Sequence, residues 1–328
     1  MMRKKHESKT LKGKKILITG GGGFIGSSLA VRLAGSNEVI LYDTDFKGNS
    51  IAYTGLERRP NVKLVKGSVT DGETLRCAAD GVTHVVHAAA VVGVQRVLKD
   101  SLRTIETNFI GSSFVLNAAT QTPGLERFLY FSTSEVFGVN AYRVNEEASS
   151  VFGSVKDPRW SYSISKIAGE HLVQSYHREH GIPTVIVRPF NIFGPRRLGE
   201  HAVKTFILQA LRGRPLTVHN TGSQIRSWCY IDDMVDALEA ALVRDAAVGE
   251  VFNVGNPMNT VSVYHLAKLI VALCKSRSPI RMETIEFTDV ELRVPDVSKA
   301  RELLGFSPRV ELNEGLAAAK RWYAANPS

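Results

Sequence analysis

The sequence predicts an α/β fold, a doubly wound parallel sheet with a smaller α/β lobe at its C-terminal side. Short runs rich in Val, Ile and Leu alternate with helical segments through the first 190 residues, which is typical of parallel sheets covered on both faces. A glycine-rich stretch separates the first strand from the first helix. Beyond residue 190 the elements become shorter. A chain of 328 residues is long enough for one large domain or for two that share a core.

Strands and helices alternate in the first part of the chain. We expect strands at residues 14–19, 38–43, 62–66, 83–87, 127–132 and 183–188. We expect helices at residues 24–34, 73–79, 100–120 and 161–180. Because helices join successive strands, the strands should run parallel and the helices should cover both faces of the sheet.

The second part of the chain predicts four more helices, at residues 203–211, 232–244, 262–274 and 314–325. Asp232 and Ser262 are the N-cap candidates of two of them. Residues 251–254 (VFNV) are typical of a strand that returns to the sheet. We therefore expect a basic disordered tail at 1–12, a first domain at 13–190 with the returning strand, and an interleaved lobe at 191–328. This lobe would close over the carboxyl ends of the strands, where ligands bind in such folds.

The formal net charge of +9 points at first to nucleic acid, but residues 1–15 alone carry +6 of it. We therefore expect no nucleic-acid partner. With 44% hydrophobic and 22% charged residues, the composition excludes a disordered chain. No run of 18 apolar residues predicts a membrane span. Three widely spaced cysteines favour neither a disulfide framework nor a metal site, and we expect a cytoplasmic protein without a metal.

The glycine-rich stretch carries the first chemical signal. Gly20, Gly23 and Gly26 have a G-x-x-G-x-x-G spacing between a strand and a helix. Such glycines let the backbone approach a pyrophosphate, whose charge the helix N-terminus stabilises. Asp43 ends the second strand, where a carboxylate binds ribose hydroxyls and disfavours a 2′-phosphate. The pattern predicts an NAD site rather than an NADP site.

A second signal is the pair Tyr162 and Lys166. Four residues apart on the predicted helix 161–180, their side chains share one face. A nearby ammonium should lower the pKa of the phenol toward the range of a general base. The spacing is common by chance, but its position after the glycine loop and after STSE at 132–135 favours a catalytic role.

Together these motifs make the sequence similar to the extended short-chain dehydrogenase/reductase family, in its nucleotide-sugar epimerase, dehydratase and decarboxylase branch. The matching segments are TGGGGFIG (19–26), HAAA (87–90), STSEVFG (132–138), YSISK (162–166), RPFNIFGPR (188–196), RSWCYIDD (226–233), FNVGN (252–256) and RVPDVSKARELLGF (293–306). The resemblance implies a Rossmann domain, NAD as cofactor and a UDP-sugar substrate. It also implies a homodimer formed through the helices near 103–120 and 161–180.

The resemblance assigns roles residue by residue. The catalytic positions are Thr133, Ser134, Glu135, Tyr162 and Lys166. The cofactor-binding positions are Gly20, Gly23, Phe24, Ile25, Gly26, Asp43, Ala88, Ala89, Asn108 and Lys166. The substrate-binding positions are Arg159, Asn191, Arg226 and Arg293. Two alternatives stay open, namely Arg159 as a surface arginine and Glu135 as a helix cap or salt-bridge partner.

The residue types at positions 134 and 135, here Ser and Glu, differ between the enzymes of this family that catalyse different reactions. Sugar 4,6-dehydratases usually carry Asp-Glu there, and losing the Asp removes the acid that protonates a departing C6 hydroxyl. Ser-Glu resembles the UDP-glucuronate decarboxylases. Family members oxidise the sugar at C4, which turns a glucuronate into a β-keto acid that readily loses carbon dioxide. We therefore predict an NAD-dependent UDP-glucuronate decarboxylase that forms a UDP-pentose. The alternatives are a UDP-uronate 4-epimerase, a UDP-N-acetylglucosamine 4,6-dehydratase and a catalytically inactive, NAD-binding regulatory protein.

Overall fold

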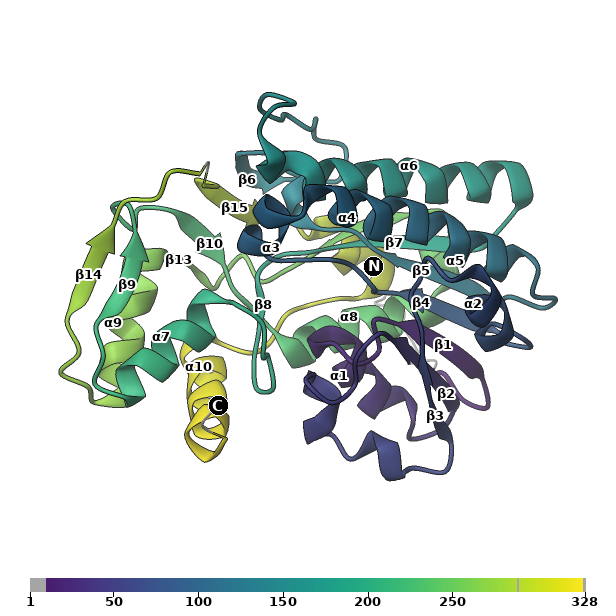
Figure 1. Ribbon diagram of the computed structural model, residues 1–328, viewed down its shortest axis with the longest axis horizontal. Coiled ribbons are helices and arrows are strands. Elements are labelled where there is room, and N and C mark those ends of the chain that lie inside the picture. Colours follow the sequence, from purple (N-terminus) through teal and green to yellow (C-terminus); the bar gives the residue numbers. More distant parts are fainter. Residues whose placement is uncertain (1–9, 288, 327–328) are drawn as a thin grey trace, which may run out of the picture.

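The computed structural model describes residues 10–287 and 289–326. Its central element is a seven-stranded parallel sheet with the order β12-β7-β5-β4-β1-β2-β3 (Figure 1). The strands are β1 (Lys15–Thr19), β2 (Glu38–Asp43), β3 (Val62–Lys66), β4 (His84–His87), β5 (Arg127–Phe131), β7 (Thr184–Pro189) and β12 (Val251–Val254). All neighbouring pairs are parallel. The predicted doubly wound sheet is confirmed, and its order reverses between β1 and β4, where such sheets bind ligands.

Helices cover both faces of this sheet because alternate side chains of each strand point to opposite layers. Ile16 and Ile18 of β1 pack in one core with α1 (Phe24–Leu33) and α8 (Ile231–Val243). Leu17 packs in the other core, with α2 (Gly72–Ala78), α5 (Gly111–Thr120) and α6 (Ser161–His180). Figure 1 shows α5 and α6 on the side of the sheet opposite α1 and α8.

The single helix predicted at 100–120 is three consecutive pieces. These are α4 (Ser101–Ile105), the π-helical segment η3 (Glu106–Ile110) and α5, and α3 (Val94–Lys99) precedes them. The wider turn of η3 contains Asn108, whose side chain binds the main chain of Val91. The remaining short helical segments are η1 (Ser50–Tyr53), η2 (Leu56–Arg58), η4 (Ser134–Phe137), η5 (Pro158–Trp160), η6 (Asp245–Ala247) and the π-helical η7 (Ala300–Leu304).

The smaller lobe contains a four-stranded sheet of order β13-β10-β15-β6, and two two-stranded sheets, β11-β8 and β14-β9, accompany it. The strands are β6 (Asn140–Val144), β8 (Ile192–Phe193), β9 (Leu216–His219), β10 (Ile225–Ser227), β11 (Cys229–Tyr230), β13 (Thr260–Ser262), β14 (Ile280–Glu283) and β15 (Leu292–Pro295). The helices are α7 (Ala202–Leu211), α9 (Val263–Cys274) and α10 (Leu312–Ala325). The two parts of the fold are interleaved in sequence, since β6 of the smaller lobe precedes residue 190 and β12 of the central sheet follows it.

Two local expectations need correction and one is confirmed. Helix α8 begins at Ile231 with Tyr230 as its N-cap, so Asp232 lies in the first turn instead, where a carboxylate still favours the helix dipole. Ser262 does cap α9, since its hydroxyl accepts the His265 N–H.

The predicted tail at 1–12 is the second correction. Residues 1–9 lie outside the described residues, but Leu11 is buried in the core. Its carbonyl accepts a hydrogen bond of 2.9 Å from the Asn37 amide. The folded part of the chain therefore includes Leu11, because this apolar side chain packs in the core with residues of α1 and β2.

None of the helices in the described part of the chain is both long and apolar enough to cross a membrane. The three cysteines are unpaired. Within residues 10–287 and 289–326, no group of three or more His, Cys, Asp or Glu side chains could hold a metal ion.

Candidate active site

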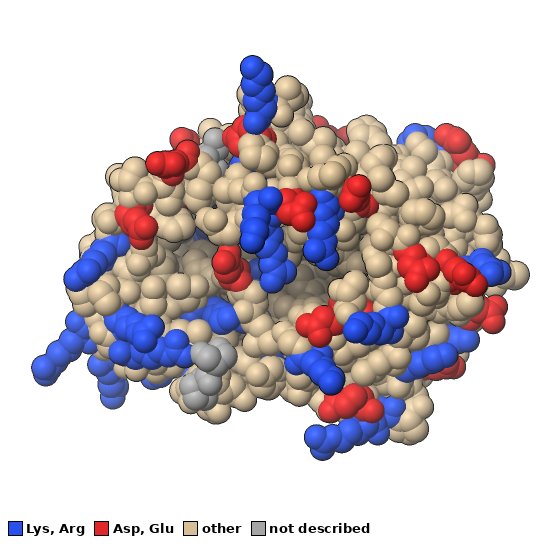
Figure 2. All heavy atoms as spheres, viewed as in Figure 1, with Lys and Arg blue, Asp and Glu red and all other residues tan. Residues whose placement is uncertain are grey.

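A cavity of about 1190 Å³ lies at the carboxyl ends of the central strands, between the sheet and the smaller lobe. Figure 2 shows the hollow in the middle of this face, with charged side chains of both signs around it. Pockets for a single small ligand are typically about 300–1,000 Å³. This cavity therefore has room for a cofactor and a substrate together.

The glycine loop forms one wall of the cavity. Gly20 has a φ of +71°, and a Cβ there would lie 2.6 Å from the main-chain nitrogen of Ala89. A Cβ on Gly26 would lie 2.4 Å from the Gly20 oxygen. Only glycine fits such close approaches of backbone to backbone. The loop thus delivers the N-terminus of α1, beginning at Phe24, to the cavity as a phosphate site.

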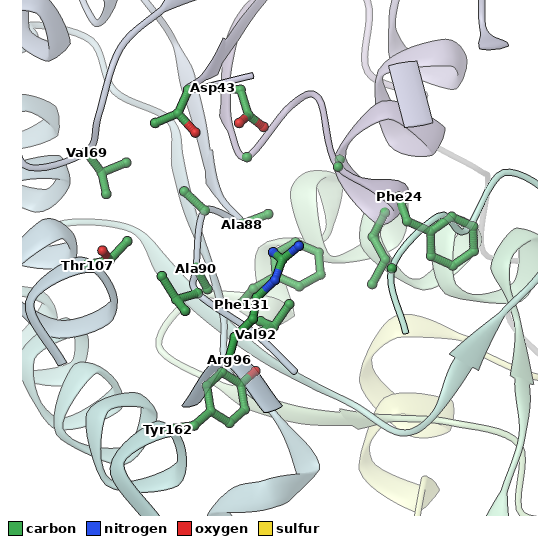
Figure 3. A pocket seen from close by; sticks show the side chains of 18 of the residues that line it. Phe24, Asp43, Val69, Ala88, Ala90, Val92, Arg96, Thr107, Phe131 and Tyr162 are labelled. Carbon is green, nitrogen blue, oxygen red and sulfur yellow. The ribbon is translucent and has the colours of Figure 1, made fainter. Parts of the chain in front are cut away.

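Asp43 lies at one end of the cavity and Tyr162 at the other (Figure 3). One carboxylate oxygen of Asp43 accepts the Gly22 N–H at 2.9 Å, and the other accepts the Asp45 N–H at 3.3 Å. Burial raises the pKa of this carboxyl, although these hydrogen bonds oppose the shift. The fixed carboxylate can accept hydrogen bonds from ribose hydroxyls, so the residues present fit an extended dinucleotide.

Burial shifts the pKa values of the catalytic pair, Tyr162 and Lys166. Burial raises the pKa of Tyr162 to about 12, although a hydrogen bond with Thr133 opposes the shift. The Lys166 ammonium donates to the main-chain oxygen of Phe131 at 2.7 Å. Burial lowers the pKa of Lys166 to about 7. Desolvation is the largest influence on the pKa of both groups, and the expected lowering of the Tyr162 pKa by Lys166 stays a prediction.

An acidic side chain beside Tyr162 is surrounded by arginines. Glu135 Oε2 lies 2.6 Å from Arg159 Nη2, and Glu135 Oε1 lies 3.9 Å from Arg293 Nη2. Burial alone would raise the pKa of Glu135, but Arg293 and Arg159 hold it below its ordinary value. Arg159 is only 4% exposed, so it is not a surface arginine. Glu135 is indeed a salt-bridge partner, and it remains a lining residue of the cavity.

Two arginines of the smaller lobe lie next to each other in this cluster. Arg226 of β10 and Arg293 of β15 are register partners on parallel strands. Arg226 pairs with Asp289 at 3.4 Å. Burial lowers the pKa of Arg293 to about 10. Like charges side by side repel each other, so this pair favours an anionic ligand nearby.

Most residues predicted for the site line one cavity. They are Gly20, Gly23, Phe24, Ile25, Gly26, Asp43, Ala88, Ala89, Thr133, Ser134, Glu135, Tyr162, Lys166 and Asn191. The lining does not include Arg159, Arg226 and Arg293, which lie behind Glu135, or Asn108. Asn108 binds the main chain of Val91, a lining residue. It holds the cavity wall in place.

Sequence reasoning missed Arg197, another lining residue. Two consecutive arginines directly after the RPFNIFGP motif (188–195) were the available signal. It also missed the buried pair of Glu170 and Arg188 behind the catalytic strand end. Glu170 follows Lys166 by one helical turn, so it shares the same face of α6.

Comparison with known proteins defines the class. The sequence model of the NAD dependent epimerase/dehydratase family matches residues 16–255. The chain belongs to this family, and the resemblance to its nucleotide-sugar branch is confirmed. NAD is accordingly the cofactor for which the glycine loop and Asp43 are arranged.

Individual relatives narrow the comparison. The chain is 35% identical to UDP-N-acetyl-alpha-D-glucosaminuronate decarboxylase of Bacillus cytotoxicus, covering 94% of this chain and 98% of the relative. It is 37% identical to UDP-glucuronic acid decarboxylase 6 of Arabidopsis thaliana, covering 92% and 86%. The solved UDP-glucuronic acid 4-epimerase of Bacillus cereus, in complex with UDP-glucuronic acid and NAD, has a TM-score of 0.85 and 28% identity, covering 95% and 99%.

Proposed function

We propose that this protein is an NAD-dependent UDP-glucuronate decarboxylase that releases carbon dioxide and forms a UDP-pentose. The observation that carries the proposal is Glu135 with Arg159 and Arg293, directly beside Tyr162 and Thr133. A sugar that bears a carboxylate needs a cationic site at C5 as well as a base at C4. The relatives named as decarboxylases support the same reaction.

The first step acts at the C4 hydroxyl. When bound, NAD supplies the two-electron oxidation of C4 and its later reversal. Tyr162 accepts the hydroxyl proton, and Thr133 donates a hydrogen bond to the same oxygen. Because burial holds the pKa of Tyr162 near 12, its deprotonation requires a neighbouring cation. The buried ammonium of Lys166 on the same helix face is the residue that can supply it.

The second step breaks the bond between C5 and the carboxyl carbon. The electron pair of that bond moves into the C4–C5 bond as carbon dioxide departs, and the C4 oxygen becomes an enolate. Tyr162 and Thr133 stabilise this oxyanion by hydrogen bonds. Arg159 and Arg293 lie behind Glu135, and their positive charge favours a carboxylate at this wall of the cavity. Glu135, kept ionised by these arginines, orients the C5 group and relays a proton from water to C5.

A second candidate substrate is UDP-N-acetylglucosaminuronate. The Bacillus cytotoxicus relative, which acts on that sugar by its name, matches over nearly its whole length. Both sugars carry the C5 carboxylate, so both fit the arginine cluster and differ only at C2. A UDP-uronate 4-epimerase is the alternative with a structural neighbour in its support.

The test is a product analysis. The purified protein is incubated with NAD and UDP-glucuronate, UDP-N-acetylglucosaminuronate or UDP-glucose, and products are measured by mass spectrometry together with released carbon dioxide. We expect loss of carbon dioxide from one or both uronates and no change in UDP-glucose. A product that retains the carboxylate would support the epimerase, and loss of water would support the dehydratase. Either would contradict the decarboxylase.

The assembly and location of the protein are further parts of this proposal. Exposed apolar side chains on neighbouring helices support a homodimer through the region 103–120 and α6, namely Ile105, Ile110, Phe114 and Ile164. Three unpaired cysteines support a cytoplasmic location. We also propose the lobe at 191–328 as the nucleotide-sugar lobe, supported by its Asn191, Arg226 and Arg293.

A further inference from the structure

Arg197 lies between the two functional parts of the cavity. It lines the cavity, and its guanidinium carbon is 5.5 Å from the ring centroid of Phe24, at the start of α1. Its positive charge also acts on the phenol of Tyr162. Its Nη1 donates to the Ile192 carbonyl at 3.3 Å. Arg197 is thus placed beside both the glycine loop and the catalytic hydroxyl.

The charge of Arg197 lacks a compensating carboxylate. Arg159 and Arg293 share Glu135, and Arg226 has Asp289. Among residues 10–287 and 289–326, no Asp or Glu forms an ion pair with Arg197. Its buried Nε has no hydrogen-bond partner there. Burial lowers the pKa of Arg197 to about 10, which is the expected effect on a desolvated cation without an anion.

The backbone around Arg197 is held at several points. Arg196 has a φ of +68°, a conformation that is unfavourable for a residue other than glycine. The Ser50 hydroxyl donates to the Arg196 carbonyl at 2.7 Å. The Tyr323 hydroxyl of α10 donates to the Arg197 carbonyl at 2.8 Å. Ser50 and Tyr323, both distant in sequence, thus hold the backbone around one partly buried cation, and such strain is common at ligand sites.

We propose that Arg197 binds an oxyanion of the nucleotide sugar next to Tyr162, as a substrate-binding residue. This inference rests on the proposed function for its substrate class. The oxyanion comes from one of two sources on the same molecule, the diphosphate or the sugar carboxylate. A guanidinium donates two parallel hydrogen bonds to either group.

Binding measurements distinguish the two sources without any turnover. Titration calorimetry on the NAD-bound full chain compares UDP, UDP-glucose and UDP-glucuronate for wild type, Arg197→Met and Arg197→Lys. If the diphosphate is the partner, Arg197→Met weakens all three about 10- to 100-fold. If the carboxylate is the partner, only UDP-glucuronate weakens. In either case we expect Arg197→Lys to recover part of the affinity, because it keeps the charge.

Two controls make the result decisive. Arg214→Met, on an exposed turn of the lobe, should leave all three affinities within about 2-fold, since it lies outside the cavity lining. The thermal midpoint of Arg197→Met should equal or exceed that of wild type, because the substitution removes a partly buried charge that has no ion-pair partner among the described residues. Unchanged affinities, or a loss confined to NAD, would overturn the inference.

The outcome is also separable from the proposed function. If the protein releases no carbon dioxide but Arg197→Met still loses affinity for UDP-glucose, the result supports the binding role of Arg197 and contradicts the proposed decarboxylation. If carbon dioxide is released and Arg197→Met has the affinities of wild type, the result supports the proposed decarboxylation and contradicts the binding role of Arg197.

Discussion

Glu170 and Arg188 form a bidentate ion pair behind the end of β5, the strand that leads to Thr133. Arg188 Nε and Nη2 donate to the two carboxylate oxygens of Glu170 at 2.8 and 2.6 Å, and both side chains are buried. The hydroxyl of Ser132 donates to the same carboxylate. The pair thereby joins α6, β7 and the residue that precedes Thr133.

Removing one partner of this pair should be costly. Glu170→Gln removes the charge of the carboxylate that pairs with the buried Arg188 guanidinium, and breaking a buried ion pair in this way typically destabilises a protein by about 3–5 kcal/mol. The measurement is urea unfolding followed by circular dichroism. Glu250→Gln is the matched control, because Glu250 makes an ion pair of 2.6 Å with Lys299 in which the two side chains are 38% and 26% exposed. Such pairs contribute about 0–1 kcal/mol. Equal losses in the two variants would contradict the argument from burial.

Tyr162→Phe should lower kcat for UDP-glucuronate by about two orders of magnitude or more. The substitution removes only the phenolic hydroxyl that exchanges the C4 proton. The affinities for NAD and UDP-glucuronate should stay near wild type, as calorimetry can show. Tyr142→Phe is the control, since Tyr142 is 64% exposed on β6. A near-normal rate in Tyr162→Phe would reject the assigned base.

Gly26→Ala tests the close packing of the glycine loop. The added Cβ would lie 2.4 Å from the Gly20 oxygen, so the loop must move away from its phosphate-binding position. We expect the affinity for NAD to fall at least about 10-fold, equivalent to about 1.4 kcal/mol. At Gly35 the nearest atom to an added Cβ is 3.4 Å away, so Gly35→Ala should bind NAD normally. Fluorescence titration with NADH gives both values.

The buried histidine His87 predicts a loss of stability in mild acid. Burial lowers its pKa to about 3, whereas the unfolded chain has a pKa near 6.5. Between these values the unfolded state binds a proton that the folded state does not, so stability falls as pH decreases. The loss reaches about 2 kcal/mol at pH 5. We expect His87→Gln to reduce the change in unfolding free energy between pH 7 and pH 5, while His84 and His201, whose pKa values burial also lowers, contribute the rest.

Histidine substitution on the surface is the control for that measurement. His180 is exposed at the end of α6, so His180→Gln should keep the wild-type dependence on pH. A slope that is identical in wild type and His87→Gln would show that another group controls the acid sensitivity.

If the protein is a homodimer through the region 103–120 and α6, a charged side chain in the contact should convert the dimer into a monomer. Ile110 is 45% exposed in the segment between α4 and α5, and Ile110→Glu would place a charge in the contact. Light scattering should give twice the 36.0 kDa of one chain for wild type and a single chain for the variant. Val155→Glu is the control, because Val155 is 93% exposed outside these helices. A wild-type monomer would refute the assembly.

Elements with strong local signals were predictable from the sequence. Helix α6 begins and ends at the predicted residues 161 and 180, since Gly181 with a φ of +65° terminates it. The strand 251–254 also has its predicted bounds. The π-helical segment inside 100–120 was not predictable, because a single wide turn within a helix has no residue signature of its own.

Whether a contact in the site could be predicted depended on the sequence separation of its two residues. Glycine spacing and the Tyr162–Lys166 pair act within one turn, and local sequence shows them. The bond between Glu135 and Arg159 joins residues 24 positions apart, and the position of Arg197 depends on a hydroxyl 126 residues away in α10. No local pattern carries such information.

The placement of β12 has a consequence for synthesis on the ribosome. This strand forms the edge of the central sheet beside β7, yet it follows the first part of the smaller lobe in sequence. A nascent chain that has reached residue 190 therefore exposes the unpaired edge of β7. The sheet is complete only after residue 254 has left the ribosome. We therefore expect the growing chain to need chaperones most while residues 190–254 are being synthesised.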